Sequence, residues 1–251
     1  MAKIALITGA TSGIGKATAQ LFAQHGLDLI LCGRREDRLQ ELQRELTARV
    51  RVHTLAFDIR NRSAVETAIG SLPADWQPID VLVNNAGNAH GLAPIQEGSV
   101  EDWDAMMDGN VKGLLYVSKV VIPGMVSRRS GHIVNIGSLA AKEVYPNGNV
   151  YCASKQAVDA LTQGMRLDLN PFGIKVTGIH PGLVETEFSV VRFKGDAQRV
   201  GNVYKGYQSL VAEDVADVIW YAVSRPPHVM IADLVVLPTA QASATVVNKQ
   251  S

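Results

Sequence analysis

Cysteine is scarce in this chain, and the two that it has, Cys32 and Cys152, are too few for a disulfide framework. The six histidines are scattered without metal-ligand spacing, so we expect no metal site. The sequence has no run of about 18 apolar residues and no start typical of a secretory signal, which predicts a cytoplasmic protein without a membrane partner. The formal net charge is zero, without a basic stripe, and this argues against a nucleic-acid partner.

Apolar residues make up 47% of the 251 positions, enough for one sizeable core. Short apolar runs alternate with helical patterns, such as those at 36–49, 100–128 and 151–169. This alternation predicts parallel strands covered by helices on both faces, with ligands at the carboxyl ends of the strands. We expect a single-domain, Rossmann-type, doubly wound α/β fold over residues 1–251, with strands at 3–8, 27–32, 51–57, 81–84, 132–136, 174–179 and 233–237.

The first expected strand ends in a glycine-rich turn that contains Gly9, Gly13 and Gly15. A helical apolar pattern follows at once and ends near His25. The amino end of such a helix presents free backbone amides to a pyrophosphate, and glycines remove the side chains that would block its approach. A glycine turn also occurs as a plain connection, but its place at the start of a βαβ unit favours a dinucleotide site.

The second expected strand runs into Gly33, Arg34 and Arg35 rather than into an acidic residue. Folds that bind NAD usually offer a carboxylate at this corner to the ribose 2′-hydroxyl, whereas NADP needs cations for its 2′-phosphate. Two guanidiniums can bind that phosphate through charge-assisted hydrogen bonds. The alternative is a solvated helix start, although cations are unfavourable there unless an anion binds. The corner therefore predicts NADP(H).

Tyr151 and Lys155 stand four residues apart in an expected helix, so their side chains share one face. A nearby ammonium favours the phenolate and lowers the phenol pKa from its usual value near ~10. With an oxidised nicotinamide bound, Tyr151 becomes a usable acid or base near neutrality. Ser138, at the end of another apolar strand, is expected to hold the reacting hydroxyl or carbonyl against the tyrosine.

The order of these motifs resembles the short-chain dehydrogenase/reductase family over essentially the whole chain. The resemblance rests on Gly9, Gly13, Gly15, Asn84 to Gly87, Asn110, Ser138, Tyr151 and Lys155. It implies an oxidoreductase whose catalytic residues are Asn110, Ser138, Tyr151 and Lys155. In such proteins the asparagine interrupts a helix and helps to hold a water near the lysine. Gly109 departs from the larger residue usual beside it.

The same resemblance implies a coenzyme site assembled from the loops that follow the strands. Asp58 is expected near the adenine amino group, although an aspartate before a helix is also an ordinary cap. The cofactor-binding residues that we expect are Gly9, Thr11, Ser12, Gly13, Ile14, Gly15, Arg34, Arg35, Asp58, Ile59, Asn85, Ala86, Gly87, Tyr151, Lys155, Pro181, Gly182, Val184 and Thr186.

Within the family, several segments look like the NADP-dependent 3-hydroxy acid dehydrogenases, which include serine and allo-threonine dehydrogenases and malonic semialdehyde reductases; sulfoacetaldehyde reductases are similar too. The segments are 33–39, 58–62, 148–151, 181–188 and 191–195. This likeness implies a small anionic substrate of the serine, allo-threonine, 3-hydroxyisobutyrate, 3-hydroxypropionate or isethionate type, interconverted with its semialdehyde or keto form. It leaves open whether the acid group is a carboxylate or a sulfonate. By family analogy we expect a homotetramer.

The stretch 187–210 breaks the regular alternation and is interpreted as a mobile substrate lid. Arg192 in this stretch is the preferred anchor for the acid group of the substrate, and Lys194 is the second candidate. A charge-assisted bond contributes about 1.5 to 3 kcal/mol, roughly ten- to hundredfold discrimination over a neutral alcohol. Asn147 is expected to bind other polar groups, although an Asn-Gly turn is an equally good interpretation. The tail 238–251 has an open role.

Two other functions fit parts of the pattern. A 3-oxoacyl carrier-protein reductase or a broad carbonyl reductase uses the same four catalytic residues and NADPH, but it needs an open pocket, and the former also needs a basic docking face. A non-catalytic NADP(H) sensor has the same fold and no need for a tyrosine-lysine pair. The sequence therefore favours the 3-hydroxy acid enzyme.

Overall fold

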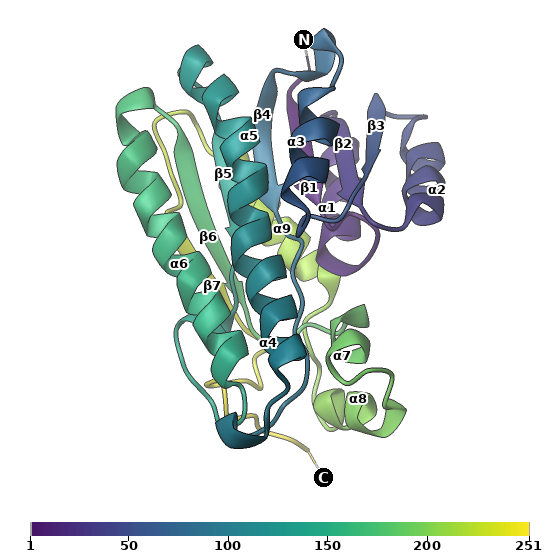
Figure 1. Cartoon of the computed structure of the whole chain (residues 1–251), viewed down its shortest axis with the longest axis vertical. Coiled ribbons are helices and arrows are strands. Elements are labelled where there is room, and N and C mark those ends of the chain that lie inside the picture. The colour runs from purple at the N-terminus through teal and green to yellow at the C-terminus, as the bar shows by residue number, and fades with distance from the viewer. Residues whose placement is uncertain (1, 251) are drawn as a thin grey trace.

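A parallel sheet runs through the centre of the molecule, with strands in the order β3-β2-β1-β4-β5-β6-β7 (Figure 1). This arrangement comes from a computed structural model, which describes residues 2–250. Its strands are β1 (Ile4–Thr8), β2 (Asp28–Gly33), β3 (Val52–Ala56), β4 (Ile79–Asn84), β5 (His132–Ile136), β6 (Lys175–Pro181) and β7 (Asp233–Val236). The expected Rossmann-type fold is confirmed, because every neighbouring pair is parallel and strand order reverses between β1 and β4.

Helices cover both faces of the sheet (Figure 1). Helices α1, α2 and α9 pack on one face, and α3, α5 and α6 pack on the other. Among residues 2–250, no helix combines the length and apolar character needed to cross a membrane. The helices are α1 (Gly13–Gln24), α2 (Glu36–Leu46), α3 (Arg62–Gly70), α4 (Val100–Met107), α5 (Gly113–Arg128), α6 (Asn149–Leu169), α7 (Glu187–Arg192), α8 (Ala197–Tyr204) and α9 (Ala212–Val223).

The central strands β1 and β4 are mostly apolar because both of their faces are buried. In β1, Ala5 and Ile7 join the core under α1 and α9, whereas Ile4 and Leu6 join the core under α3 and α5. Successive side chains of a strand point to opposite faces, so one continuous apolar run serves two cores. This double burial fixes the sheet and leaves its carboxyl edge as a rigid base for the loops that follow each strand.

One segment differs from the sequence-based expectation. The stretch 187–210, expected to be irregular, contains α7 and α8, and both lie beyond the carboxyl edge of the sheet (Figure 1). Each helix begins with a side-chain cap: Thr186 accepts from Phe188 N, and Asp196 accepts from Arg199 N. The tail folds back on its own chain, where Gln250 N donates to the carbonyl oxygen of Gly206.

Candidate active site

A cavity of about 520 Å³ opens at the carboxyl edge of the sheet, lined by the loops after β1 to β6. These loops bring together almost all of the residues expected to bind the coenzyme, and they also contain Ser138, Tyr151, Lys155 and Arg192. Four expected site residues do not line it: Gly15, Asn110, Asn147 and Lys194. Residues distant in the sequence therefore meet where ligands bind in open α/β sheets.

The glycine turn after β1 is shaped by close backbone contacts. Gly9 and Gly13 have φ angles of 67° and 49°, in the left-handed region that favours glycine. Gly15 lies behind the cavity, and a β-carbon there would collide with the carbonyl oxygen of Gly9. Because Ser12 makes no side-chain cap at the start of α1, backbone amides remain available at that helix end. This turn fits a phosphate group.

The arginine corner after β2 is partly occupied by protein groups. Arg35 donates to Thr11 Oγ1 and Ser12 Oγ, each at 2.8 Å from Nη2, and to Glu187 Oε2 at 2.8 Å from Nη1. Arg34 is more open, with Nη1 3.9 Å from the Asp58 carboxylate. A hydrogen bond from Arg60 holds the pKa of Asp58 below its usual range. Arg34 thus retains free donors toward the cavity.

Tyr151 and Lys155 occupy the buried end of the cavity, on the first turns of α6. Lys155 Nζ donates to the carbonyl oxygen of Ile136, at the end of β5, over 3.0 Å. Ser138 follows the same strand, and its Oγ accepts from Ala140 N at 3.1 Å, which fixes the hydroxyl at the cavity wall. The end of β5 therefore positions Ser138 directly and Lys155 through its hydrogen bond to Ile136.

The phenol pKa differs from the expectation that the Lys155 ammonium lowers it, because burial has the larger effect. Burial raises the pKa of Tyr151, while a hydrogen bond from Ser138 and the charge of Arg192 lower it in part. Burial also lowers the pKa of Lys155 to about 8. In the protein alone the phenol is therefore protonated at neutral pH, because its loss of hydration outweighs the nearby positive groups.

Asn110 lies in a π-helical turn at Asp108–Lys112, which joins α4 to α5 within the expected helix at 100–128. Its Nδ2 donates to the carbonyl oxygen of Asn88 at 2.9 Å and to Ser154 Oγ at 3.0 Å, and its Oδ1 accepts from Asn88 N at 2.7 Å. A β-carbon on Gly109 would come within 2.8 Å of Asn88 Nδ2. Glycine at 109 thus leaves space for the asparagine that holds Asn110.

Asn110 and Lys155 are close neighbours although only the lysine lines the cavity. Gly87 lies between them, and a β-carbon there would be 2.9 Å from Asn110 Oδ1 and 3.5 Å from Lys155 Nζ. The carboxyl end of β4, the π-helical turn and α6 therefore meet at one point. This geometry fits a hydrogen-bonded path that leads from the lysine toward Asn110.

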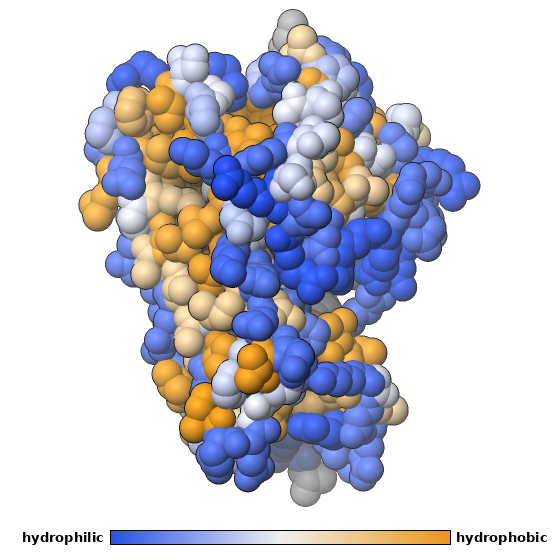
Figure 2. All heavy atoms as spheres, viewed as in Figure 1, coloured by the Kyte–Doolittle hydropathy of each residue, from blue (hydrophilic) through white to orange (hydrophobic). Residues whose placement is uncertain are grey.

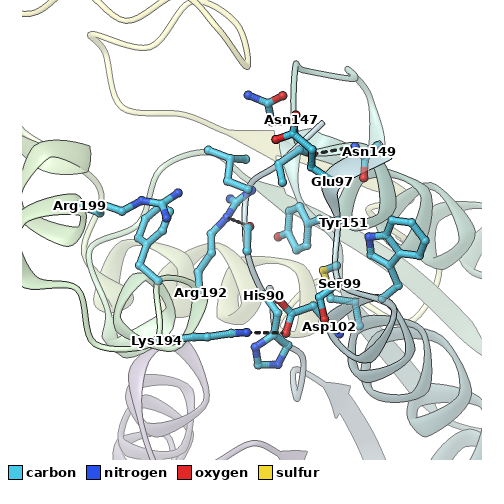
Figure 3. Close-up of a pocket in the computed structure, with 18 residues that line it drawn as sticks. His90, Glu97, Ser99, Asp102, Asn147, Asn149, Tyr151, Arg192, Lys194 and Arg199 are labelled. Atoms are coloured by element: carbon cyan, nitrogen blue, oxygen red, sulfur yellow. Dashed lines mark hydrogen bonds and ion pairs between the residues drawn. The ribbon is translucent and has the colours of Figure 1, made fainter. Parts of the chain in front are cut away.

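A second cavity, of about 280 Å³, lies beside the first and is lined by Asn147, Arg192 and Lys194 among others (Figure 3). Arg192 reaches both cavities. Its guanidinium carbon lies 5.3 Å from the centre of the Tyr151 ring, and its Nη2 donates to Tyr145 Oη at 2.9 Å. Of the two expected anchors, Arg192 is therefore the one placed against the tyrosine.

Lys194 is directed elsewhere. Its Nζ pairs with Asp102 Oδ1 at 3.0 Å on the far side of the smaller cavity (Figure 3). Asn147 takes a left-handed conformation, with φ of 64°, as in the turn that the Asn-Gly pair suggested. Neither side chain reaches the large cavity, because the lysine is held by an acid and the asparagine forms a turn before α6.

Sequence reasoning missed several polar residues of the large cavity, and two of them support other parts of the site. Glu187, at the start of α7, binds Arg35 and also Arg38, whose Nη1 lies 2.7 Å from Glu187 Oε1. Gln241, in the tail, accepts from Leu183 N at 2.9 Å and supports the loop after β6. The only sequence signal for Glu187 was its place just after Thr186, and Gln241 had none.

One cluster of potential metal ligands occurs among the described residues, away from this site. Asp159, His180 and Asp233 bring their ligand atoms within 4.8 Å of one another. The ammonium of Lys142 already lies between the two carboxylates, at 3.0 Å from Asp159 and 2.9 Å from Asp233. A lysine thus supplies the positive charge in this cluster.

Comparison with known proteins gives consistent matches over nearly the whole length. Residues 3–196 match the family described as short chain dehydrogenase. The chain is 47% identical over 242 residues to the NADP-dependent 3-hydroxy acid dehydrogenase YdfG of Escherichia coli (strain K12), covering 96% of this chain and 97% of that protein. It is 46% identical over 243 residues to sulfoacetaldehyde reductase 2 of Chromohalobacter salexigens, with 96% of each covered.

Among solved structures, the closed form of a serine dehydrogenase complexed with NADP+ superimposes with a TM-score of 0.92 at 46% identity. The superposition covers 97% of this chain and 98% of that one. The three relatives thus carry three different substrate names on one fold.

Proposed function

Because the chain belongs to the short-chain dehydrogenase family, we propose that it is an NADP(H)-dependent oxidoreductase that interconverts a small anionic 3-hydroxy acid and its semialdehyde or keto form. The observation that carries the proposal is the position of Arg192, a cation 5.3 Å from the ring of Tyr151 at the wall of the large cavity. A cation at this place suits a substrate whose acid group lies one or two carbons from the reacting hydroxyl.

The coenzyme fits the residues of the large cavity. The glycine turn before α1 suits the pyrophosphate, and the free donors of Arg34 suit the 2′-phosphate. A bound nicotinamide coenzyme accepts or supplies the hydride. The names of the relatives support this assignment, since one is called NADP-dependent and another was solved with NADP+.

The protein's own groups handle the proton. Ser138 and Tyr151 hold the reacting oxygen. In the oxidation direction the Tyr151 phenolate takes up the proton of the alcohol, and in the reverse direction the Tyr151 phenol donates it. Lys155, hydrogen-bonded to the carbonyl oxygen of Ile136, lies close to Asn110 across Gly87. We assign these two residues to the path that passes the proton on toward solvent.

The test is a panel of serine, allo-threonine, 3-hydroxyisobutyrate, 3-hydroxypropionate and isethionate, each assayed with NADP+ and NAD+. We expect turnover of at least one of them, with kcat/KM for NADP+ about tenfold or more above that for NAD+. An uncharged alcohol of similar size is the control. Activity that rises when the acid is esterified would instead indicate a broad carbonyl reductase, and no turnover in any arm would contradict the proposal.

We also propose that the chain assembles through the face formed by α5 and α6, as a homotetramer. Apolar residues gather along this face (Figure 2), and Leu115 on α5 and Leu167 on α6 are both exposed. Large exposed apolar patches mark interaction sites. Light scattering coupled to gel filtration tests this, and a monomer at micromolar concentration would contradict it.

A further inference from the structure

Glu187 links the arginine corner to the start of α7 through ion pairs that have no part in the proposed hydride and proton transfer. Its two carboxylate oxygens bind two different guanidiniums, with Arg35 Nη1 at 2.8 Å and Arg38 Nη1 at 2.7 Å. These arginines come from the corner after β2 and from α2, about 150 residues earlier in the chain. Hydrogen bonds from Arg35 and Arg38 hold the pKa of Glu187 below its usual range, so the carboxylate is charged at neutral pH.

The other end of α7 is fixed as well. Arg192, its last residue, donates from Nε to the carbonyl oxygen of Gly91 at 3.3 Å, and its own carbonyl oxygen accepts from Gly91 N at 3.0 Å. Ser189, in the middle of α7, shares a 2.6 Å hydrogen bond with Tyr204 of α8. One short helix therefore spans from the arginine corner to the guanidinium that faces Tyr151.

The charges at the corner are compatible with an anion and Glu187 together. Arg34, Arg35, Arg38 and Arg60 carry four positive charges, and Glu187 and Asp58 supply two negative charges. The remaining charge of two is close to that of a phosphate monoester, which is about −1.5 to −2 at neutral pH. Four of the five N–H groups of Arg35 already bond Thr11, Ser12 and Glu187. The free donors of Arg34 and the one remaining N–H of Arg35 can take the phosphate while Arg38 keeps its bond to Glu187.

We infer that Glu187 is a positioning residue that fastens the lid helix α7 over the coenzyme and thereby places Arg192 for the substrate. The inference rests on the proposed function for its ligands, but the ion pairs themselves exist in the protein without any ligand. The pairs with Arg35 and Arg38 slow coenzyme release and keep Arg192 against Tyr151. Loss of Glu187 should therefore affect both the retention of NADPH and the KM of the hydroxy acid.

The first test needs no coenzyme. Hydrogen exchange at the α7 amides should be about three- to tenfold faster in Glu187→Gln than in the wild type, as expected for the loss of two partly exposed ion pairs. Arg38→Gln removes one of the two pairs without touching the cavity and should give a smaller change in the same direction. Glu185→Gln is the matched control, because Glu185 bonds Ser209 rather than an arginine. Equal exchange in all four proteins would overturn the inference.

The second test uses NADPH fluorescence and steady-state kinetics. In Glu187→Gln we expect NADPH release about threefold faster or more, and a similar rise in the KM of the hydroxy acid with kcat within about twofold. Tighter NADPH binding with an unchanged KM would overturn the inference, because it would show that the carboxylate only competes with the phosphate. A wild type that fails to bind NADPH would instead contradict the proposed function, while the exchange experiment would still judge the role of Glu187.

Discussion

The two ends of the large cavity are built in opposite ways. At the arginine corner the side chains of Arg34 and Arg35 are 69% and 39% exposed. At the catalytic end Tyr151 and Lys155 are only 8% and 6% exposed. Water screens charges at the first end, whereas the protein interior strengthens electrostatic effects at the second. The exposed end is therefore suited to attract an anion, and the buried end to set proton affinities.

The catalytic end depends on the coenzyme that the arginine corner helps to bind. Burial alone moves both pKa values at the catalytic end toward the neutral forms, upward for Tyr151 and downward for Lys155. A protonated phenol is ready to donate a proton but not to accept one. We expect the oxidised coenzyme, whose nicotinamide ring is positively charged, to lower the phenol pKa and make the oxidation direction possible.

The largest effect should come from the buried end. Replacing Tyr151 by Phe removes the only hydroxyl proposed to exchange a proton with the substrate, so kcat should fall by about 10²- to 10⁴-fold. NADPH affinity, measured by fluorescence, should change by less than about twofold, because the phosphate-binding groups lie elsewhere. The exposed Tyr221, replaced by Phe, is the control. Full turnover by the Tyr151 variant would refute its role.

The pH dependence of the free energy of unfolding tests the lowered pKa of Lys155 without any measurement of catalysis. The pKa of Lys155 is about 8 in the folded protein and near ~10.4 in an unfolded chain. Between these values the unfolded chain binds the proton and the folded one does not, so this residue makes stability rise with pH. From pH 7 to 10 the unfolding free energy of the wild type should gain about 2 to 3 kcal/mol relative to Lys155→Met.

Urea unfolding at several pH values measures this change. The matched control is Lys119→Met, at an exposed position of α5. If the unfolding free energies of the wild type and the Lys155 variant changed equally with pH, the ammonium would be hydrated in the folded protein. The catalytic end would then not differ from the arginine corner in its exposure to water.

Arg192 combines features of both ends of the cavity, because it lies on α7, in the proposed lid, and faces the buried Tyr151. Arg192→Gln should lower kcat/KM for a hydroxy acid about ten- to hundredfold while changing it little for an uncharged alcohol. Arg199→Gln is the matched control, since Arg199 lines only the smaller cavity, where it stacks on Phe193. Equal losses for charged and uncharged substrates would mean that Arg192 only holds the lid in place.

The sequence predicted those parts of the fold and site that depend on local pattern. The central strands could be located because burial of both faces makes them mostly apolar runs, as in β1 at Ile4–Thr8. The glycine turn and the spacing of Tyr151 and Lys155 are likewise short-range features. Helices α7 and α8 were missed although their caps at Thr186 and Asp196 were visible, because both helices are short.

What the sequence could not supply were partners distant along the chain. No local pattern shows that Glu187 binds Arg35 and Arg38, or that Asp102 takes the ammonium of Lys194. These contacts depend on how loops from different strands meet at the sheet edge. They decide which cations remain free, and they leave Arg192 rather than Lys194 as the proposed substrate anchor.

The smallest expected effect concerns salt, and it compares the two ends within one unmodified protein. Raising the ionic strength from about 0.05 to 0.5 M shortens the Debye length severalfold and screens Arg34 and Arg35, so KM for NADPH should rise about two- to fivefold. The kcat at saturating NADPH should stay within about 1.5-fold, because Tyr151 and Lys155 are shielded from ions by burial. NADH, which lacks the 2′-phosphate, is the control and should show a much weaker dependence. If kcat fell in step with the rise in KM, salt would be reaching the catalytic end, and the distinction between an exposed recruiting end and a buried chemical end would not hold.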